Sequence, residues 1–427
     1  MYFLKRWGKR KDHSKEKRPS GGPISFIFRA KDLVLILTLA SLNFVFIWPF
    51  WGRDYPLVTF SAPVLPLFAR GFAFLTPFSF SQAVGLLVLL SFPLSSCAWY
   101  IFFKKLSGSS LLSFLAGLIF LLPWFFLPRF TLFWQKGDGV HALGFAALPL
   151  VGIILGQFLR TGSFKLFLAS FFGVSFISLV SPFTLLNLYL FFLILTFSEM
   201  LLGQARIKIL RFLVVCLFAQ GFSSFWYHPE FLLSLLKSGQ GQKAISSFWK
   251  LFPVSFFTIP IFGAFSFLIF DRKPNLQPLF FALTFSTLYV ALVAAENFGD
   301  YLPFPVPARF FPEFYVGLSF FLAIFIVFLI NLPKKGLSLG KIHPRLAFVH
   351  HSSEIFLTAF LTAFLIWPLF SVTSGVPIIP FRSSPQVLGA STAWWEVSRD
   401  GVSQLIGYGI TFLTTIVSVF LRKRIKT

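Results

Sequence analysis

The chain has 427 residues, of which 56% are hydrophobic and only 14 are acidic, and its formal net charge at pH 7 is +23. Apolar runs close to the roughly 20 residues that cross a bilayer recur along the chain, and they exclude a soluble globular protein. The basic residues lie mainly in short segments between these runs and in the two tails, so the charge indicates membrane topology and not nucleic-acid binding.

A basic tail, residues 1–31, precedes the first apolar run and is expected to stay in the cytoplasm beside anionic lipid headgroups. Residues 32–421 form the predicted transmembrane domain, and residues 422–427 form a second basic tail. The predicted fold class is all-α, a polytopic integral membrane protein. About twelve spans are predicted, near 32–51, 81–103, 111–127, 140–159, 164–180, 182–202, 207–226, 251–270, 278–296, 312–332, 354–371 and 403–421.

An even number of spans places both termini on one side of the membrane. The tails and alternate loops of that side carry 27 Lys and Arg, against 10 on the other side. Because cytoplasmic loops carry the excess of basic residues, both termini are predicted to be cytoplasmic in a plasma membrane. The outer loops then lie near 52–80, 128–139, 227–250, 297–311 and 372–402. Residues 64–75 of the first are either a short interfacial helix or a plain hydrophobic loop.

Two acids near the outer ends of spans are the main candidates for chemistry. Asp54 follows the first span, and Asp138 precedes the fourth, with His141 three residues later on the same helical face. Converging carboxylates can hold a divalent cation such as Mg²⁺ or Mn²⁺, or one of them can act as a general base. Alternatively, Asp54 caps a turn and Asp138 caps the following helix.

Other charged groups have simpler readings. Arg309, and Arg53 beside Asp54, are candidate substrate-binding cations, because a guanidinium binds phosphate bidentately. Arg309 alternatively pairs with Glu313 or anchors its loop at the interface. Glu199 is expected to pair with Arg206 or Lys208 near the inner surface. The helices are expected to hold no series of buried charged residues, and the 65 Phe are expected mainly at lipid-facing positions.

Several segments together resemble GT-C membrane glycosyltransferases. Asp54 follows the first span, and a candidate interfacial helix comes before the second. A basic turn with small residues at Lys104 leads into an Ala/Gly/Leu helix that ends at Pro123. The later pieces are Phe145-Ala-Ala-Leu-Pro-Leu and Pro303-Phe-Pro-Val-Pro-Ala-Arg-Phe-Phe-Pro. The chain is more closely similar to the GT-C-like bacterial and archaeal proteins related to 6-pyruvoyl-tetrahydropterin synthase, over about residues 32–332.

This resemblance implies a sugar donor linked to polyprenyl phosphate, transfer on the outer face onto a cell-envelope acceptor, and a catalytic acid at Asp54. It implies that Asp138 takes the place of a second acid in metal-dependent members. The expected partners are membrane lipids and the lipid-linked sugar, with no nucleic acid. The chain departs from the family in lacking an acid pair at Asp54 and a large C-terminal outer domain. The alternative is a non-enzymatic flippase, channel or envelope assembly factor.

Overall fold

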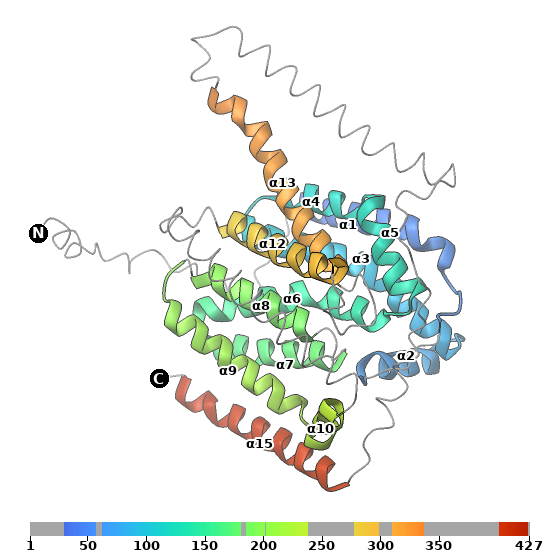
Figure 1. Ribbon diagram of the computed structural model, residues 1–427, viewed down its shortest axis with the longest axis vertical. Helices are drawn as coiled ribbons and strands as arrows, with labels where there is room; N and C mark the ends of the chain where they lie inside the picture. The colour runs from blue at the N-terminus through green and yellow to red at the C-terminus, as the bar shows by residue number, and fades with distance from the viewer. Residues whose placement is uncertain are drawn as a thin grey trace, which may run out of the picture.

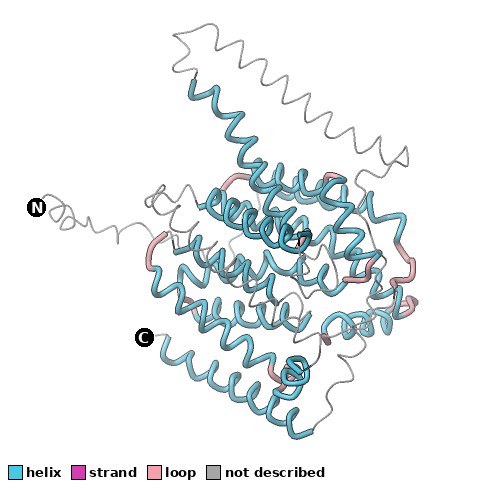
Figure 2. Tube along the Cα trace, viewed as in Figure 1, coloured by secondary structure: helices cyan, strands magenta, loops and turns pink. Residues whose placement is uncertain are grey.

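The computed structural model describes residues 30–56, 62–180, 185–200, 202–237, 277–298, 310–336 and 401–425. Every regular element within these ranges is helical, and several of the helices are apolar (Figure 2). The predicted class, a helical multi-pass membrane protein, is therefore supported by the part of the chain described. The predicted spans at 251–270 and 354–371 lie outside these ranges.

The described helices match the other predicted spans to within a few residues, with two shorter helices in the outer loops. Their bounds are α1 Ala30–Ile47, α2 Val64–Leu75, α3 Phe80–Ser107, α4 Ser110–Leu121, α5 Pro123–Phe130, α6 Gly139–Thr161, α7 Phe164–Val180, α8 Leu185–Met200, α9 Ala205–Ser223, α10 Pro229–Lys237, α12 Gln277–Phe298, α13 Phe311–Gly336 and α15 Gly401–Ile425. A 3-10 turn, Trp48–Phe50, extends α1, and a π-helix, Thr131–Gln135, follows α5.

Not all of these helices are long and apolar enough to cross a membrane alone. Four meet that condition within the described residues, namely Ala30–Phe50, Phe80–Ser107, Gly139–Thr161 and Gly401–Phe420, and the α4–α5 pair adds a fifth if it is one bent span. Shorter apolar helices, such as Phe164–Val180 and Phe311–Val327, occupy other predicted spans. A count of twelve spans therefore stays a prediction.

The predicted span at 111–127 is not one continuous helix, because the helix breaks at Leu122. The segments on either side of the break are bent by 58°. Leu122 has an extended ψ of 143°, and Pro123 begins α5. Proline fits the first position of a helix because its missing N–H would have no partner there. The break turns α5 toward the loop that leads into α6.

The helices pack as a layered bundle (Figure 1). α3 lies between α1, α4 and α6, and the series continues from α6 through α7 and α9 to α15. α12 and α13 pack together beside α4 and α8. α1 and α15 lie at the periphery, where Val45 and Leu405 are each 70% exposed, as expected for side chains that face lipid.

Aromatic side chains fill the interior of the bundle. Trp99 lies within 5.7 Å, centroid to centroid, of Phe102, Phe103, Phe145 and Phe191, and Phe103 stacks on Phe320 at 4.0 Å. The expectation that phenylalanine lies mainly at lipid-facing positions is therefore wrong for the described residues. Offset and edge contacts between rings add to the stabilisation from burial.

Polar side chains gather at two opposite ends of the bundle. The starts of α6, α8 and α13 meet at one end, which holds Asp138 and Glu313. The C-terminal ends of α6 and α8 meet the starts of α9 and α12 at the other end, around Glu199. In the predicted topology the first is the outer end of the bundle and the second is the cytoplasmic end.

Candidate functional site

A buried polar cluster lies at the outer end, where α6, α8 and α13 meet. The Nε2 atom of His141 lies 2.8 Å from Oε1 of Glu313, and Nδ1 of the same ring lies 3.5 Å from Oδ2 of Asp138. The Asn187 amide donates a hydrogen bond of 3.1 Å to Glu313 Oε1. All four side chains are buried. The imidazole therefore lies between two carboxylates, one from its own helix and one from α13.

The local backbone places Asp138 for this contact. Asp138 occupies the N-cap position of α6, but its side chain makes no capping hydrogen bond. The capping explanation for Asp138 is therefore wrong. The i,i+3 spacing of a helix directs its carboxylate to His141 instead. Gly137, with a φ of 76°, makes the preceding turn in a conformation that disfavours residues with a side chain.

This arrangement can hold and exchange a proton. A neutral imidazole donates from one ring nitrogen and accepts at the other, whereas an ionised carboxylate only accepts. A neutral His141 therefore presents an N–H to one of its two acidic neighbours, and a protonated His141 presents an N–H to each of them, although Nδ1 makes no hydrogen bond in this conformation of the described residues. Glu313 Oε2 has no hydrogen-bond partner within the described residues. A buried acid and base in contact are the groups that general acid–base chemistry and proton-coupled movement use.

Tyr55 fastens the first outer loop to the second. Its hydroxyl donates a hydrogen bond of 2.6 Å to the Phe133 carbonyl, and its backbone exchanges hydrogen bonds with Ser81 at the start of α3. Burial, and then the nearby charge of Asp138, raise the pKa of Tyr55 well above its usual value of 10.0, so the hydroxyl stays protonated. A Cβ atom at Gly139 would lie 2.7 Å from the Tyr55 hydroxyl, so the close fit requires glycine at the start of α6.

The predicted site residues are therefore brought together in part. Asp138 and His141 are in contact, as the sequence spacing indicated. Asp54 is exposed beside the buried Tyr55, and Arg53 is exposed with its guanidinium 5.3 Å from the centre of the Phe50 ring. Arg309 lies outside the described residues, so its predicted roles stay predictions.

The sequence analysis missed Asn187 and Tyr55 and gave Glu313 a different partner. Asn187 carried a signal, since an amide inside an apolar run needs a hydrogen-bond partner in the bilayer. Glu313 was considered only as a partner of Arg309, four residues away in the chain. Its contact with His141 spans 172 positions, which spacing along one helix does not reveal.

The donor geometry does not suit the predicted metal site. Asp138 and Glu313 lie at opposite nitrogens of the His141 ring, so their oxygens do not converge on one point. No group of three or more His, Cys, Asp or Glu among the described residues is arranged to hold a metal ion. Mg²⁺ and Mn²⁺ require several converging oxygen ligands. A cation held jointly by Asp54, Asp138 and His141 does not fit this arrangement.

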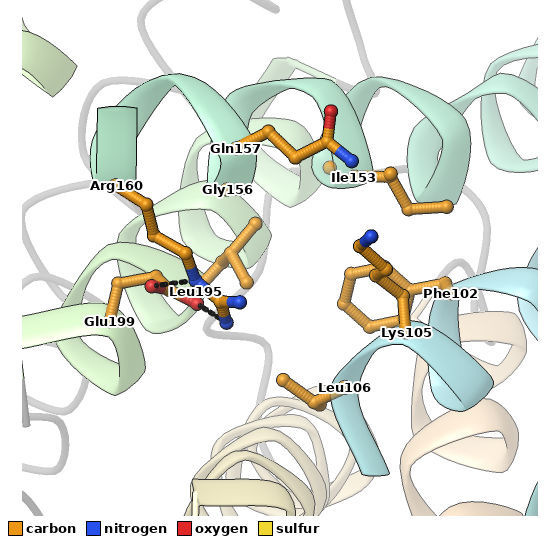
Figure 3. A pocket seen from close by; sticks show the side chains of 10 residues that line it. Phe102, Lys105, Leu106, Ile153, Gly156, Gln157, Arg160, Leu195 and Glu199 are labelled. Atoms are coloured by element: carbon orange, nitrogen blue, oxygen red, sulfur yellow. Dashed lines mark hydrogen bonds and ion pairs between the residues drawn. The ribbon is translucent and has the colours of Figure 1, made fainter. Parts of the chain in front are cut away.

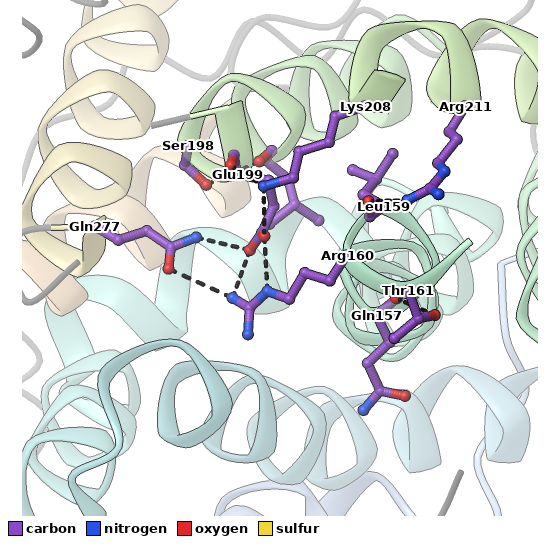
Figure 4. Close-up of polar contacts among 10 residues, drawn as sticks. Gln157, Leu159, Arg160, Thr161, Ser198, Glu199, Lys208, Arg211 and Gln277 are labelled. Atoms are coloured by element: carbon purple, nitrogen blue, oxygen red, sulfur yellow. Dashed lines mark hydrogen bonds and ion pairs between the residues drawn. The ribbon is translucent and has the colours of Figure 1, made fainter. Parts of the chain in front are cut away.

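A small pocket, with a cavity volume of about 30 Å³, opens at the cytoplasmic end, between α3, α6 and α8 (Figure 3). Beside it, the Glu199 carboxylate accepts two hydrogen bonds from Arg160, of 2.7 and 2.6 Å, and one of 2.7 Å from Gln277 (Figure 4). Lys208 Nζ donates to the Glu199 carbonyl at 2.5 Å. The expected ion pair with Lys208 is present, with 4.0 Å between Nζ and Oε2. Arg160 is the closer partner, however, and Glu199 is buried, so the expected surface setting is wrong.

A fully buried arginine lies at the break between α4 and α5. Arg129 donates hydrogen bonds of 3.0 Å to the Phe125 carbonyl and 2.8 Å to the Phe120 carbonyl. Its guanidinium carbon lies 3.4 Å from the centre of the Phe120 ring, a cation–π contact. The expectation that the helices hold no series of buried charged residues is thus wrong. The buried charged or ionisable residues include Asp32, Arg129, Asp138, His141, Glu199, Lys208 and Glu313.

Comparison with known proteins gives no relative for this arrangement. No protein-family model, no curated protein and no solved structure matches the chain.

Proposed function

We propose that this chain is a membrane glycosyltransferase of the GT-C type, which moves a sugar from a polyprenyl-phosphate donor onto a cell-envelope acceptor at the outer face of the plasma membrane. The observation that supports it is the contact between the first two outer loops. Tyr55 hydrogen-bonds to Phe133 and lies against Gly139. Asp54, the exposed acid of the first loop, is therefore held at the same end of the bundle as Asp138.

The exposed and buried groups take different roles in this proposal. Asp54 is accessible to substrate and removes the proton from the acceptor hydroxyl as its oxygen attacks the anomeric carbon. The bond to the polyprenyl phosphate breaks, and the lipid phosphate leaves. Arg53 and Arg309 bind that phosphate. The buried cluster of Asp138, His141 and Glu313 fixes the start of α6, against which Tyr55 holds the first loop.

The test is transfer of labelled sugar by purified protein in liposomes that contain polyprenyl-phosphate sugars and an envelope acceptor extract. Asp54→Asn is expected to lower transfer by at least about a hundredfold, because general-base catalysis contributes about 10²- to 10⁴-fold. Glu230→Gln, which alters an acid of another outer loop, is the matched control and should retain parental transfer. Equal transfer by Asp54→Asn and the parent would contradict the catalytic role.

A second candidate, a flippase for envelope lipids, is favoured by a specific observation. The His141 side chain is 1% exposed and that of Glu313 is also 1% exposed, so substrate does not reach this acid–base pair in the described conformation. Buried ionisable groups inside a membrane commonly belong to ion or substrate pathways. The discriminating measurement is movement of a fluorescent polyprenyl-phosphate analogue across protein-containing liposomes. Movement without sugar transfer, lost in Glu313→Gln but kept in Asp54→Asn, would favour the flippase.

The proposed sidedness has its own test. Single cysteines at position 54 and at exposed position 165, in a background without Cys97 and Cys216, are treated with a membrane-impermeant thiol reagent on intact cells. Asp54→Cys should react at once and Lys165→Cys only after permeabilisation. The reverse result would place Asp54 in the cytoplasm and remove the glycosyltransferase proposal.

A further inference from the structure

The pocket at the cytoplasmic end combines cationic and apolar walls. Lys105, at the end of α3, and Arg160, at the end of α6, lie on its rim, and Gln157 lies one helical turn before Arg160 (Figure 3). The remaining lining residues are Phe102, Leu106, Gly152, Ile153, Gly156, Leu195 and Glu199. A small anionic group can therefore contact two positive charges while an attached hydrocarbon chain lies along the apolar wall.

The Arg160 guanidinium is fixed before any ligand arrives. Both carboxylate oxygens of Glu199 accept hydrogen bonds from it, and the side-chain amide oxygen of Gln277 lies 3.4 Å from its Nη2 atom. A fixed guanidinium loses less conformational entropy on binding an anion than a mobile one. Its side chain is still 42% exposed, so it remains accessible from the pocket side.

Among the described residues at the ends of α6 and α8, positive charge exceeds negative charge. Glu199 is the carboxylate of this cluster, and it lies among four cationic side chains of the described residues: Lys105, Arg160, Lys208 and Arg211. Arg211 donates a hydrogen bond of 2.8 Å to the Leu159 carbonyl, which holds it beside the end of α6. Guanidinium and ammonium groups such as these can donate several hydrogen bonds to a phosphate group, which presents several acceptor oxygens.

Small residues of α6 leave the floor of the pocket open. A Cβ atom added at Gly156 would have no neighbour within 4 Å, although the residue lies inside the bundle. Four positions earlier, a Cβ atom at Gly152 would lie 2.8 Å from the Phe191 ring, so that glycine is required by packing. Packing therefore explains Gly152 but not Gly156, and the space over Gly156 is available to a ligand.

We propose that this pocket binds a phosphate group carried by an anionic lipid of the cytoplasmic leaflet, with the phosphate on Lys105, Arg160 and Gln157 and the lipid chain along Phe102, Leu106 and Leu195. Basic pockets between membrane helices on the cytoplasmic side are suited to lipid headgroups. The site lies at the opposite end of the bundle from Asp54 and does not depend on glycosyl transfer.

The cations also have a competing explanation. Lys105 and Arg160 lie in the last turns of α3 and α6, where cations interact favourably with the negative end of the helix dipole. They also contribute to the excess of positive charge that is expected in cytoplasmic loops. Neither explanation requires an open space at Gly156 or a difference between Lys105 and other basic residues at the same end. The experiment therefore tests the open space at Gly156 and compares Lys105 with another basic residue at the same end.

The experiment measures lipid binding to the delipidated full-length chain by native mass spectrometry in detergent, with phosphatidic acid, phosphatidylcholine and inorganic phosphate as probes. The parent is expected to retain phosphatidic acid and not phosphatidylcholine. Lys105→Gln and Gly156→Leu are each expected to weaken phosphatidic acid binding by about fivefold to tenfold, the first through charge and the second by filling the pocket.

Lys165→Gln is the matched control, because Lys165 is exposed at the start of α7 in the adjacent cytoplasmic turn. It should bind phosphatidic acid as the parent does. Displacement of the lipid by millimolar inorganic phosphate would identify the phosphate group alone as the ligand, and resistance to displacement would identify the lipid. Undiminished binding in folded Lys105→Gln and Gly156→Leu, or equal loss in Lys165→Gln, would overturn the proposal in favour of general surface charge.

Discussion

His141 and Glu313 are joined across 172 positions of the chain by a contact of 2.8 Å between Nε2 and Oε1, and both side chains are 1% exposed. The contact fixes the start of α13 against the first turn of α6. A buried ionisable group without a partner costs several kcal/mol, so each of the two residues depends on the other for part of its contribution to stability. Asp138 also contacts His141, and Asn187 also contacts Glu313. Their coupling is therefore measurable.

The first prediction concerns this coupling. His141→Leu and Glu313→Leu are each expected to lower the free energy of unfolding by about 3–5 kcal/mol, because each leaves a buried partner without its contact. The double variant should lose less than the sum, with a coupling energy of about 1–3 kcal/mol. The measurement is reversible unfolding in mixed detergent micelles. If the loss in the double variant equals the sum of the two single losses within about 0.5 kcal/mol, the two residues act independently.

Asp54→Leu provides the control for these variants. It also replaces an acid by leucine at the outer end, but Asp54 is exposed. Its effect on the unfolding free energy is expected to stay within about 0.5 kcal/mol, as for most surface substitutions. A larger loss would indicate a structural role for Asp54 in addition to the proposed catalytic one.

The second prediction concerns pH and Tyr55. Its folded-state pKa lies well above 10.0 because the hydroxyl is buried, whereas in the unfolded chain it ionises near 10.0. Above that pH the unfolded state binds fewer protons than the folded state, so stability is fully present below pH 10 and falls as pH rises, by about 1.4 kcal/mol per pH unit for this group. Tyr55→Phe removes the contribution of this hydroxyl to the slope of unfolding free energy against pH.

The measurement compares unfolding free energy at pH 9 and pH 11 in the parent and in Tyr55→Phe. Tyr408→Phe, at a tyrosine that is 56% exposed on α15, is the control and should leave the parental slope unchanged. At pH 9, Tyr55→Phe should also cost about 1 kcal/mol through loss of the hydrogen bond to the Phe133 carbonyl. An unchanged slope in Tyr55→Phe would show that the hydroxyl is not buried as described.

The helices were largely predictable, because a run of apolar residues in a membrane protein has few alternatives to a helix. The proline-bracketed segment at 64–75 forms a helix with these same bounds, α2. The break at Leu122 was not predicted. Hydropathy is high on both sides of it, and Pro123 is equally compatible with the end of a straight span. α13 packs against both α4 and α5, a contact between distant segments that the linear sequence does not specify.

The candidate site was predictable only within single helices. The pairing of Asp138 with His141 follows from helical periodicity. Glu313 and Asn187 join them through contacts between helices, which depend on how α6, α8 and α13 rotate about their axes. Glu199 shows the same limit, since proximity in sequence indicates its partner Lys208, whereas its closer partner, Arg160, comes from α6. Sequence periodicity shows which residues share one face of a helix, but it does not show which other helix that face contacts.

The third prediction concerns Arg129. Arg129→Lys keeps the charge but loses the planar guanidinium that serves the Phe120 and Phe125 carbonyls and stacks on the Phe120 ring. The expected loss of unfolding free energy is about 2–4 kcal/mol, since two hydrogen bonds and a cation–π contact are weakened. Arg70→Lys, at an exposed arginine of α2, is the matched control and should stay within about 0.5 kcal/mol. Equal effects of the two variants would show that Arg129 is not held by these contacts.

The fourth prediction concerns Glu199, which keeps the cytoplasmic ends of α6 and α8 together. Glu199→Gln leaves Arg160 and Lys208 without a negative partner and is expected to cost about 3–5 kcal/mol, as for other broken buried ion pairs. Adding Arg160→Gln should restore part of this loss, because an amide pair can hydrogen-bond without buried charge. Thermal unfolding of the two variants measures the effect.

The same two variants separate stability from phosphate binding. If Glu199→Gln is folded, removal of its negative charge should strengthen phosphatidic acid binding by about fivefold, since the cations of the pocket are then less neutralised. The double variant lacks the Arg160 cation and should bind more weakly than the parent despite its recovered stability. If phosphatidic acid binding instead falls in Glu199→Gln and recovers in the double variant, as stability does, Glu199 and Arg160 act only by holding α6 and α8 together. They would then have no part in recognising the phosphate.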